Sequence, residues 1–197
     1  MSTKLAVVYY STYGTNYTMA SIAAEAGKAA GADVRLLKVP ETVSDEIVAA
    51  VEGWKAVADK TRDVATATPA DLEWADAFLF SAPTRFGVQA SQMRAFIDTL
   101  GPIWAKGDLA NKAISAMTSA QNAHGGQEQT LMSFYATAIH WGGIVVAPGF
   151  TDPCIFKTGG NPYGYSHTQG QPFTDDDKAS IGHQVRRLLD VAGKLRG

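Results

Sequence analysis

The hydrophobic positions of this chain fall into five runs of strand length, and enough residues for a helix separate each run from the next. Within the runs the apolar side chains are continuous, whereas a strand with one face in water would alternate apolar and polar residues. Continuous runs are typical of strands that helices cover on both faces, as in a parallel sheet. The predicted strands are residues 5–10, 34–39, 77–82, 113–117 and 144–147.

Between these runs, apolar residues recur at the spacing of a helix that buries one face. The predicted helices are residues 17–30, 44–58, 91–100 and 127–141, and a last helix that begins at a cap formed by Thr174 and Asp177. We expect the first two helices to pack on the sheet. Strands that alternate with helices predict an α/β fold: a flavodoxin-like, doubly wound, five-stranded parallel sheet in the order 2-1-3-4-5, with helices on both faces. No long polar linker divides the chain, so residues 1–197 are expected to form one domain.

Three stretches, residues 59–70, 118–127 and 149–173, show neither period. The first closes at Thr68-Pro69, which predicts the start of a short helical turn. The last is rich in glycine and proline. Loops of this length are uncommon in compact domains, so we expect a structureless loop that is functional or that contacts another subunit.

The composition narrows the choice of partners and location. Charged residues make up only 18% of the chain, so a monomer would leave much neutral surface in water and we expect oligomers. A formal net charge of −2, without any stripe of Lys or Arg, argues against binding to nucleic acid. Cys154 is the only cysteine, which excludes intramolecular disulfides and suits a reducing compartment. No apolar run reaches membrane-spanning length and no leader pattern is visible, so we expect a cytoplasmic protein without a membrane span.

The segment between the first strand and the first helix has the pattern of a phosphate-binding turn. It reads Ser11-Thr12-Tyr13-Gly14-Thr15-Asn16, with a glycine that allows a tight turn and side chains that hydrogen-bond phosphate oxygens. Such a turn directs backbone N–H groups and the positive end of a helix dipole at one point. Neither Gly-Lys-Ser/Thr nor Gly-x-Gly-x-x-Gly is present, which favours a monophosphate, such as that of flavin mononucleotide (FMN), bound without a metal. The alternative is an ordinary turn capped by Thr15 or Asn16.

The loop after the third strand is expected beside this turn, because ligands of open parallel sheets bind beyond the carboxyl ends of the strands. Thr84 and Arg85 offer hydrogen bonds, and Phe86 offers a flat face to a heteroaromatic ring such as isoalloxazine. The alternative is a core phenylalanine beside a surface arginine.

The loop after the fourth strand consists of small and polar residues. It reads Ser119-Ala120-Gln121-Asn122-Ala123-His124 and continues into Gly125-Gly126. Its N–H groups suit the pyrimidine edge of a flavin, which gains negative charge on reduction. The glycine pair also suits a plain loop end before the next helix.

Two further residues, Trp104 and His140, lie outside these loops. Trp104 follows a predicted helix in a turn, where it either closes a planar pocket or anchors a subunit interface. A lone histidine on a helix, such as His140, more often packs than binds. We expect no metal site, because no motif such as H-E-x-x-H is present, and no catalytic acid, base or nucleophile is identifiable.

The sequence resembles the WrbA-type family of NAD(P)H:quinone oxidoreductases, the tryptophan-repressor-binding-protein-like flavoproteins. The motifs that carry the resemblance are YYSTYGT at 9–15, PTRFG at 83–87 with QMR at 92–94, HGGQE at 124–128 and NPYG at 161–164. The resemblance implies a flavodoxin-like fold and non-covalently bound FMN. It further implies two-electron reduction of quinones to hydroquinones with NADH or NADPH, by hydride transfer through flavin N5 in a ping-pong mechanism. The implied assembly is a homodimer or homotetramer with the sites at subunit interfaces.

The same resemblance assigns roles to residues. Ser11, Thr12, Tyr13, Gly14, Thr15 and Asn16 match the phosphate loop, and Thr84, Arg85 and Phe86 match the flavin-contacting loop. The loop at the ring edge corresponds to Ser119, Ala120, Gln121, Asn122, Ala123 and His124, and His140 is a further FMN contact. Tyr13 also matches the tyrosine of the nicotinamide site. Trp104 matches the tryptophan of the quinone pocket, which neighbouring subunits complete.

Two other functions stay open at this point. A flavodoxin that carries single electrons between proteins has the same fold, but such carriers often rely on a dense negative surface and the net charge here is only −2. The other is a module that binds a transcription factor, as the name of the family suggests. No residue pattern in the chain encodes that partner.

Overall fold

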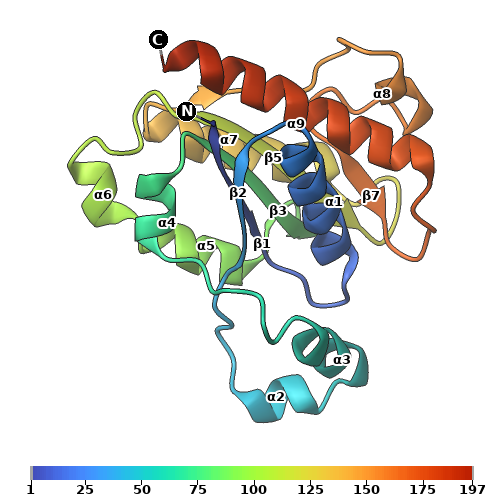
Figure 1. Ribbon diagram of the computed structural model, residues 1–197. Helices are drawn as coiled ribbons and strands as arrows, with labels where there is room; N and C mark the ends of the chain where they lie inside the picture. Colours follow the sequence, from blue (N-terminus) through green and yellow to red (C-terminus); the bar gives the residue numbers. More distant parts are fainter. Residues whose placement is uncertain (1, 197) are drawn as a thin grey trace.

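A parallel sheet runs through the middle of the molecule, with helices on both faces (Figure 1). The computed structural model describes residues 2–196. The main strands lie in the order β2-β1-β3-β5-β6, and all neighbours in this series are parallel. This confirms the predicted order 2-1-3-4-5, because β4 is a hairpin strand outside the series. The strands are β1 (Lys4–Tyr9), β2 (Asp33–Lys38), β3 (Ala77–Arg85), β5 (Ala113–Ala120) and β6 (Ile144–Val145).

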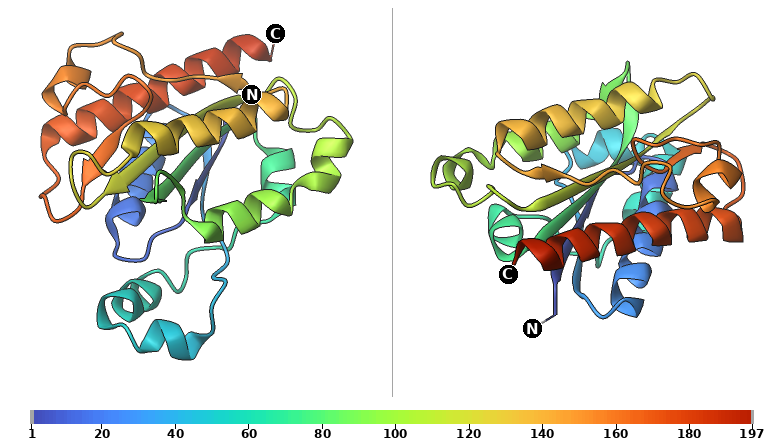
Figure 2. Two further views of the ribbon diagram at one scale, coloured as in Figure 1. Left: turned by 180° about the vertical axis from the view of Figure 1, so that it is seen from behind. Right: turned by 90° about the horizontal axis from the view of Figure 1, so that it is seen from above.

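Two apolar cores, one on each face of the sheet, explain why the strands read as continuous hydrophobic runs. Along β1, Leu5 and Val7 belong to one core, whereas Ala6 and Val8 belong to the other. The first core lies under helices α1 (Thr15–Ala29) and α9 (Asp175–Leu195). The second lies under α4 (Pro69–Trp74), α5 (Ser91–Asp98) and α7 (Gln127–His140), on the opposite face in both views of Figure 2.

The prediction of one helix over residues 44–58 that packs on the sheet is wrong. The segment forms α2 (Asp45–Ala49) and α3 (Glu52–Lys60), which project beyond the carboxyl ends of the strands (Figure 1). Val51 is extended between them, and no residue of α3 is buried. The apolar positions of α3 contact the loop after β1 instead, where Val57 lies against Gly14 and Tyr13 lies against Gly53.

The last strand of the sheet is interrupted. The short β6 pairs with the start of β5, and β7 (Ser166–Thr168) pairs with its end. Residues 146–165, which include α8 (Cys154–Lys157), leave the sheet edge and return to it. The expectation of a structureless loop at 149–173 is therefore wrong, because a strand as short and polar as β7 gives no periodic signal and is fixed only by the free edge of β5.

Two helices of the described chain begin with a capping box. Thr174 and Asp177 form a capping box at the start of α9, as predicted, and Thr68 with Asp71 forms another before Pro69.

Arg196 Nη1 donates to the carbonyl oxygen of Ser2 at 2.9 Å, so the two ends of the described chain lie side by side. None of the helices in residues 2–196 combines the length and apolar character needed to cross a membrane.

Candidate functional site

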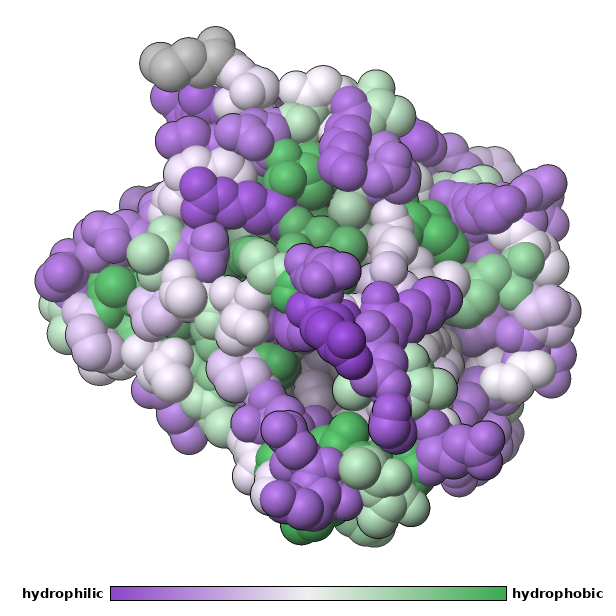
Figure 3. All heavy atoms as spheres, turned by 60° about the horizontal axis from the view of Figure 1, so that its bottom comes forward, coloured by the Kyte–Doolittle hydropathy of each residue, from purple (hydrophilic) through white to green (hydrophobic). Residues whose placement is uncertain are grey.

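The loops that follow β1, β3 and β5 meet at the carboxyl edge of the sheet, as expected for this topology. Figure 3 views this end of the molecule, where hydrophilic side chains predominate and hydrophobic patches are scattered among them. Two adjacent depressions, which share lining residues, lie here. We call the first, of about 20 Å³, the loop hollow, and the second, of about 560 Å³, the edge cavity.

The loop hollow combines hydroxyl and amide side chains with backbone N–H groups that lack a protein acceptor in the described chain. It is lined by Ser11, Thr12, Tyr13, Thr15, Asn16, Pro83, Arg85, Ser119 and Gln169. Within residues 2–196, none of the backbone N–H groups from Ser11 to Tyr17 donates to a protein acceptor. Unpaired N–H groups at the start of a fifteen-residue helix are the donors that bind phosphate oxygens. The predicted phosphate turn therefore has the backbone that its proposed role requires.

Gly14 and Asn16 fix the shape of this loop. Gly14 precedes the first residue of α1 with a φ of 90°, a left-handed conformation that glycine adopts without strain. The side chain of Asn16 is buried and joins two strand ends, because its Nδ2 donates to Ser119 Oγ at 2.7 Å and its Oδ1 accepts from Ser81 Oγ at 3.1 Å. Asn16 thus holds the loop against β3 and β5.

Arg85 supplies a positive charge to the loop hollow, which has no lysine among its lining residues. Its guanidinium donates to Thr12 Oγ1 at 3.1 Å and to the carbonyl oxygen of Thr84 at 3.0 Å. Behind Thr12, Tyr10 donates to Glu41 Oε2 at 3.0 Å. Burial raises the pKa of Tyr10 well above its usual value, so the phenol remains neutral and acts as a donor.

The edge cavity adjoins the loop hollow and shares five lining residues with it. Its lining comes from the loops after β1, β3 and β5 and consists of Tyr13, Pro83, Thr84, Arg85, Phe86, Ser119, Ala120, Gln121, Asn122, Gly125 and Gln169. Most of the residues that the sequence assigned to a ring site thus lie around one space. Ala123 and His124 are exposed and do not belong to this lining.

Phe86 occupies an unusual position at the rim of the edge cavity. Residues 84–89 form a tight hairpin in which β4 (Val88–Gln89) pairs antiparallel with the end of β3. The two turn residues, Phe86 and Gly87, have φ values of 53° and 85°, as a type I′ turn demands. A phenylalanine in this conformation is strained, and its side chain is fully exposed. Strained exposed aromatic residues are typical of binding sites, because packing does not explain them.

The hairpin is locked to the loop after β5 through close backbone contact. A Cβ atom at Gly126, whose φ is 91°, would lie 3.1 Å from Gly87 Cα. Beside this contact, Thr130 Oγ1 and Thr84 Oγ1 are hydrogen-bonded at 2.6 Å, and Thr84 donates to the carbonyl oxygen of Gly125 at 3.4 Å. Sequence reasoning missed Thr130, which is wholly buried on α7 and shows no motif of its own.

Trp104 and His140 lie together, but away from the edge cavity. Trp104 belongs to the short helix α6 (Gly101–Ala105) rather than to a turn, and its Nε1 donates to the carbonyl oxygen of His140 at 3.1 Å. Both line a depression of about 860 Å³ between α5 and α7, which we call the α5–α7 groove. The loop after β5 leads into the start of α7, whereas His140 is its last residue, so the 14 residues of the helix separate them by about 20 Å.

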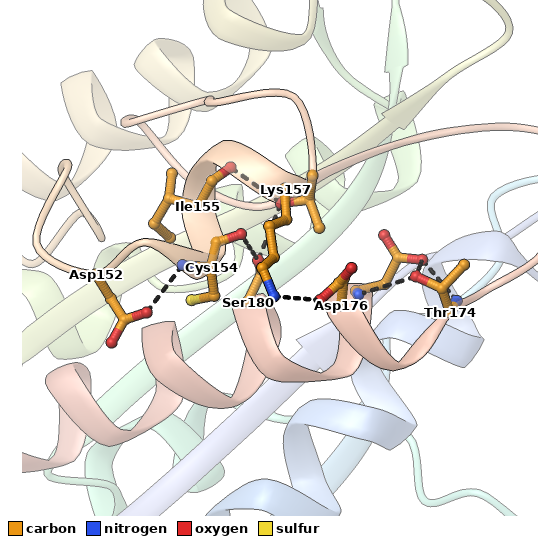
Figure 4. Close-up of polar contacts among 9 residues, drawn as sticks. Asp152, Cys154, Ile155, Lys157, Thr174, Asp176 and Ser180 are labelled. Atoms are coloured by element: carbon orange, nitrogen blue, oxygen red, sulfur yellow. Dashed lines mark hydrogen bonds and ion pairs between the residues drawn. The ribbon is translucent and has the colours of Figure 1, made fainter.

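Cys154, on α8, does not form a catalytic centre. Its backbone N–H donates to Asp152 Oδ1 at 2.9 Å. Its carbonyl oxygen accepts from Ser180 Oγ at 2.8 Å, a contact that fastens α8 to α9 (Figure 4). Burial raises the pKa of the Cys154 thiol, which keeps it protonated and a poor nucleophile. No group of three or more His, Cys, Asp or Glu residues in the described chain is arranged to hold a metal ion.

Known proteins are similar to this chain over most of its length. Residues 3–153 match the model of the family described as NADPH-dependent FMN reductase. A Deinococcus radiodurans protein named NAD(P)H dehydrogenase (quinone) is 60% identical over 195 residues, which cover 98% of each chain. A protein of the same name from Azorhizobium caulinodans is 41% identical over 204 residues, covering 98% of this chain and 99% of that protein.

Solved structures give the same fold. The WrbA-like flavodoxin from Agrobacterium tumefaciens has a TM-score of 0.67 and 22% identity, with 98% of this chain and 99% of that chain covered. A flavodoxin from the domain Archaea has a TM-score of 0.61 and 19% identity, with the same coverage. Together with the relatives at 60% and 41% identity, these matches confirm the resemblance that the sequence motifs indicate. The chain belongs to the NADPH-dependent FMN reductase family.

Proposed function

We propose that this protein is an NAD(P)H dehydrogenase (quinone) that binds FMN non-covalently in the loop hollow and the edge cavity. The observation that carries the proposal is that these two spaces share five lining residues: a cradle of unpaired N–H groups suited to a monophosphate adjoins a cavity large enough for a ring system. The relatives at 60% and 41% identity bear the name of this activity.

The residues present fit FMN at both ends. The amides of Ser11 to Asn16 and the guanidinium of Arg85 would hold the phosphate without lysine or metal. Tyr13 and Phe86 would wall the ring, and the part of the loop from Ser119 to Asn122 would face its pyrimidine edge. Bound FMN would accept a hydride from NADH or NADPH at N5 and deliver it to a quinone in a ping-pong exchange.

The chain's own contribution is orientation and the exclusion of water. Tyr13, half exposed beside the edge cavity, offers a planar surface against which a nicotinamide can lie. The contact of Gly87 with Gly126 fixes the two loops that line the cavity, so the walls need little reorganisation when a ligand enters. No side chain is assigned as an acid or base.

We propose that the working enzyme is a homodimer or homotetramer in which neighbouring copies complete each site. Trp104 and His140 cannot reach the edge cavity of their own chain, because α7 holds His140 at its far end. Trp104 is half exposed and Phe86 fully exposed, which suits surfaces that meet in an assembly. In this arrangement Trp104 lines the quinone pocket and His140 contacts FMN of a neighbouring copy. The single cysteine suits a cytoplasmic enzyme.

The proposal is tested by titrating the purified protein with FMN and recording its absorption spectrum. We expect a flavin spectrum of a bound chromophore at micromolar concentration, and then benzoquinone-dependent oxidation of NADH or NADPH. A protein that stays colourless and gives no heat with FMN contradicts the proposal. A protein that binds FMN, accumulates abundant semiquinone on photoreduction and turns over no quinone is a one-electron flavodoxin instead.

A further inference from the structure

Gln169 stands where the loop hollow joins the edge cavity. Five residues line both spaces: Tyr13, Pro83, Arg85, Ser119 and Gln169. The Ser119 hydroxyl already accepts from Asn16, and the Arg85 guanidinium already donates to Thr12 and Thr84. The carboxamide of Gln169 makes no hydrogen bond to any residue of the range 2–196.

The turn that carries Gln169 is fixed at several points. The backbone N–H of Gln169 donates to the carbonyl oxygen of Ala120 at 2.8 Å, which extends the ladder of β5 and β7 by one residue. The N–H of Gln171 donates to the carbonyl oxygen of Thr168 at 3.3 Å. Beneath the turn, buried His167 contacts the carbonyl oxygen of Gln171 at 3.1 Å and stacks on Phe173 at 4.0 Å between ring centres. A turn held in this way presents the carboxamide in a defined place.

The part of FMN that crosses from phosphate to ring is the ribityl chain, which carries hydroxyl groups that both donate and accept hydrogen bonds. A carboxamide also offers both a donor and an acceptor, which a lysine or a carboxylate does not. We propose that Gln169 binds the ribityl hydroxyls of FMN, a contact that rests on the proposed function and adds a residue outside the sequence motifs. It comes from the interrupted edge strand of the sheet.

The test measures flavin affinity by fluorescence quenching and calorimetry, with no enzyme assay. Gln169→Ala should weaken the binding of FMN and of riboflavin by the same factor, about three- to tenfold, because both ligands carry the ribityl chain and one hydrogen bond is lost. Lumiflavin, which has the ring without the chain, should bind the variant and the parent protein equally. The matched control is Gln171→Ala, which removes an exposed glutamine of the same turn that lines neither space and should leave all affinities unchanged.

Each other outcome overturns the assignment. If Gln169→Ala weakens the binding of FMN alone, the carboxamide contacts the phosphate. If it weakens the binding of lumiflavin equally, the carboxamide contacts the ring. If no affinity changes, Gln169 does not contact the flavin. Gln169→Glu adds a negative charge beside the loop hollow, so it should weaken FMN more than riboflavin. Equal effects on the two ligands would show that the junction does not lie beside the phosphate. If the parent protein does not bind FMN at all, the proposed function is wrong. Melting curves verify that each variant is folded.

Discussion

The loop hollow and the α5–α7 groove are two different ways of building a binding surface. The loop hollow consists mainly of backbone amides from one short segment, shaped by Gly14 and held in place by Asn16. The α5–α7 groove consists of side chains from separate helices, and its Trp104 is half exposed. The lining of the loop hollow comes from one chain, whereas the α5–α7 groove has the character of half an interface. We therefore expect the local turn to decide FMN binding, and the assembly of copies to decide quinone binding.

The largest effect expected from this contrast is the loss of affinity when riboflavin replaces FMN. Riboflavin lacks the phosphate, so it leaves the amides from Ser11 to Asn16 without an anion. The loss of two charge-assisted hydrogen bonds, at about 1.5 to 3 kcal/mol each, should make the binding of riboflavin weaker than that of FMN by roughly a hundredfold or more. Calorimetry at fixed pH measures the ratio. Equal affinity for the two flavins would show that the loop hollow is only a capped helix start.

The second prediction concerns Trp104. Trp104→Ala should lower kcat/KM for benzoquinone by about ten- to thirtyfold, since a large aromatic anchor contributes about 2 kcal/mol. The FMN dissociation constant should change much less, by about threefold at most, because Trp104 lies outside both spaces that would hold FMN and donates to the backbone carbonyl oxygen of His140 rather than to its ring. Equal loss of quinone turnover and FMN binding would contradict the separation of the two regions.

Mixing two variants sharpens the same prediction. A Gly14→Val chain lacks the loop hollow, and a Trp104→Ala chain lacks the quinone wall, so neither assembly alone turns over quinone well. If neighbouring copies complete each site, random co-assembly should restore about a quarter of the sites. Absence of any recovery in co-expressed protein of verified mixed composition would show that each chain forms its site alone.

Gly126→Ala should have an intermediate effect. The new methyl group meets Gly87 Cα at 3.1 Å and the φ of 91° strains any other residue, at a cost of about 1 to 2 kcal/mol. Because this contact joins the two loops of the edge cavity, we expect FMN affinity to fall by about tenfold. Gly107→Ala is the control, since its φ is also positive but no atom lies within 4 Å of the added methyl group. A similar loss in the control would assign the effect to general destabilisation.

A smaller effect is expected at the start of α9. Thr174→Ala removes the cap of α9 and should lower the free energy of unfolding by about 1 kcal/mol without changing flavin affinity. Denaturant titration and FMN calorimetry on the same preparation separate the two quantities. A change in affinity would show that α9 is coupled to the loop hollow.

The smallest effect is a pH dependence at the same cap. Burial alone would raise the pKa of Asp177, but hydrogen bonds from the Thr174 backbone and side chain and from Tyr165 outweigh it and lower the pKa. The carboxylate therefore stabilises the fold above pH of about 4, and this contribution is lost as the pH falls through the lowered pKa. Between pH 5 and 3 the Tm of the parent protein should fall more steeply than that of Asp177→Asn. Parallel curves would contradict the role of the cap.

Sequence reasoning succeeded where the physical signal is local. Continuous apolar runs predicted the parallel sheet, the flavodoxin-like fold type supplied its strand order, and Thr174 with Asp177 predicted the start of the last helix. It failed where tertiary contact decides. The stripe of residues 44–58 looked like a sheet-packing helix but covers the loop after β1, and β7 is too short and polar to show a period. For the site, the sequence placed the loops, but Thr130 and Gln169 became visible only in three dimensions.

The interrupted edge strand also has a practical meaning for protein engineering. Because β6 and β7 hold opposite ends of β5, the chain between them is a detour that closes on itself. Arg196 and Ser2 are in contact, so a short linker can join the two ends of the described chain. New ends opened at exposed Gly159 would preserve every strand neighbour and the first βα turn. Such a circular permutant is expected to fold and still turn yellow with FMN.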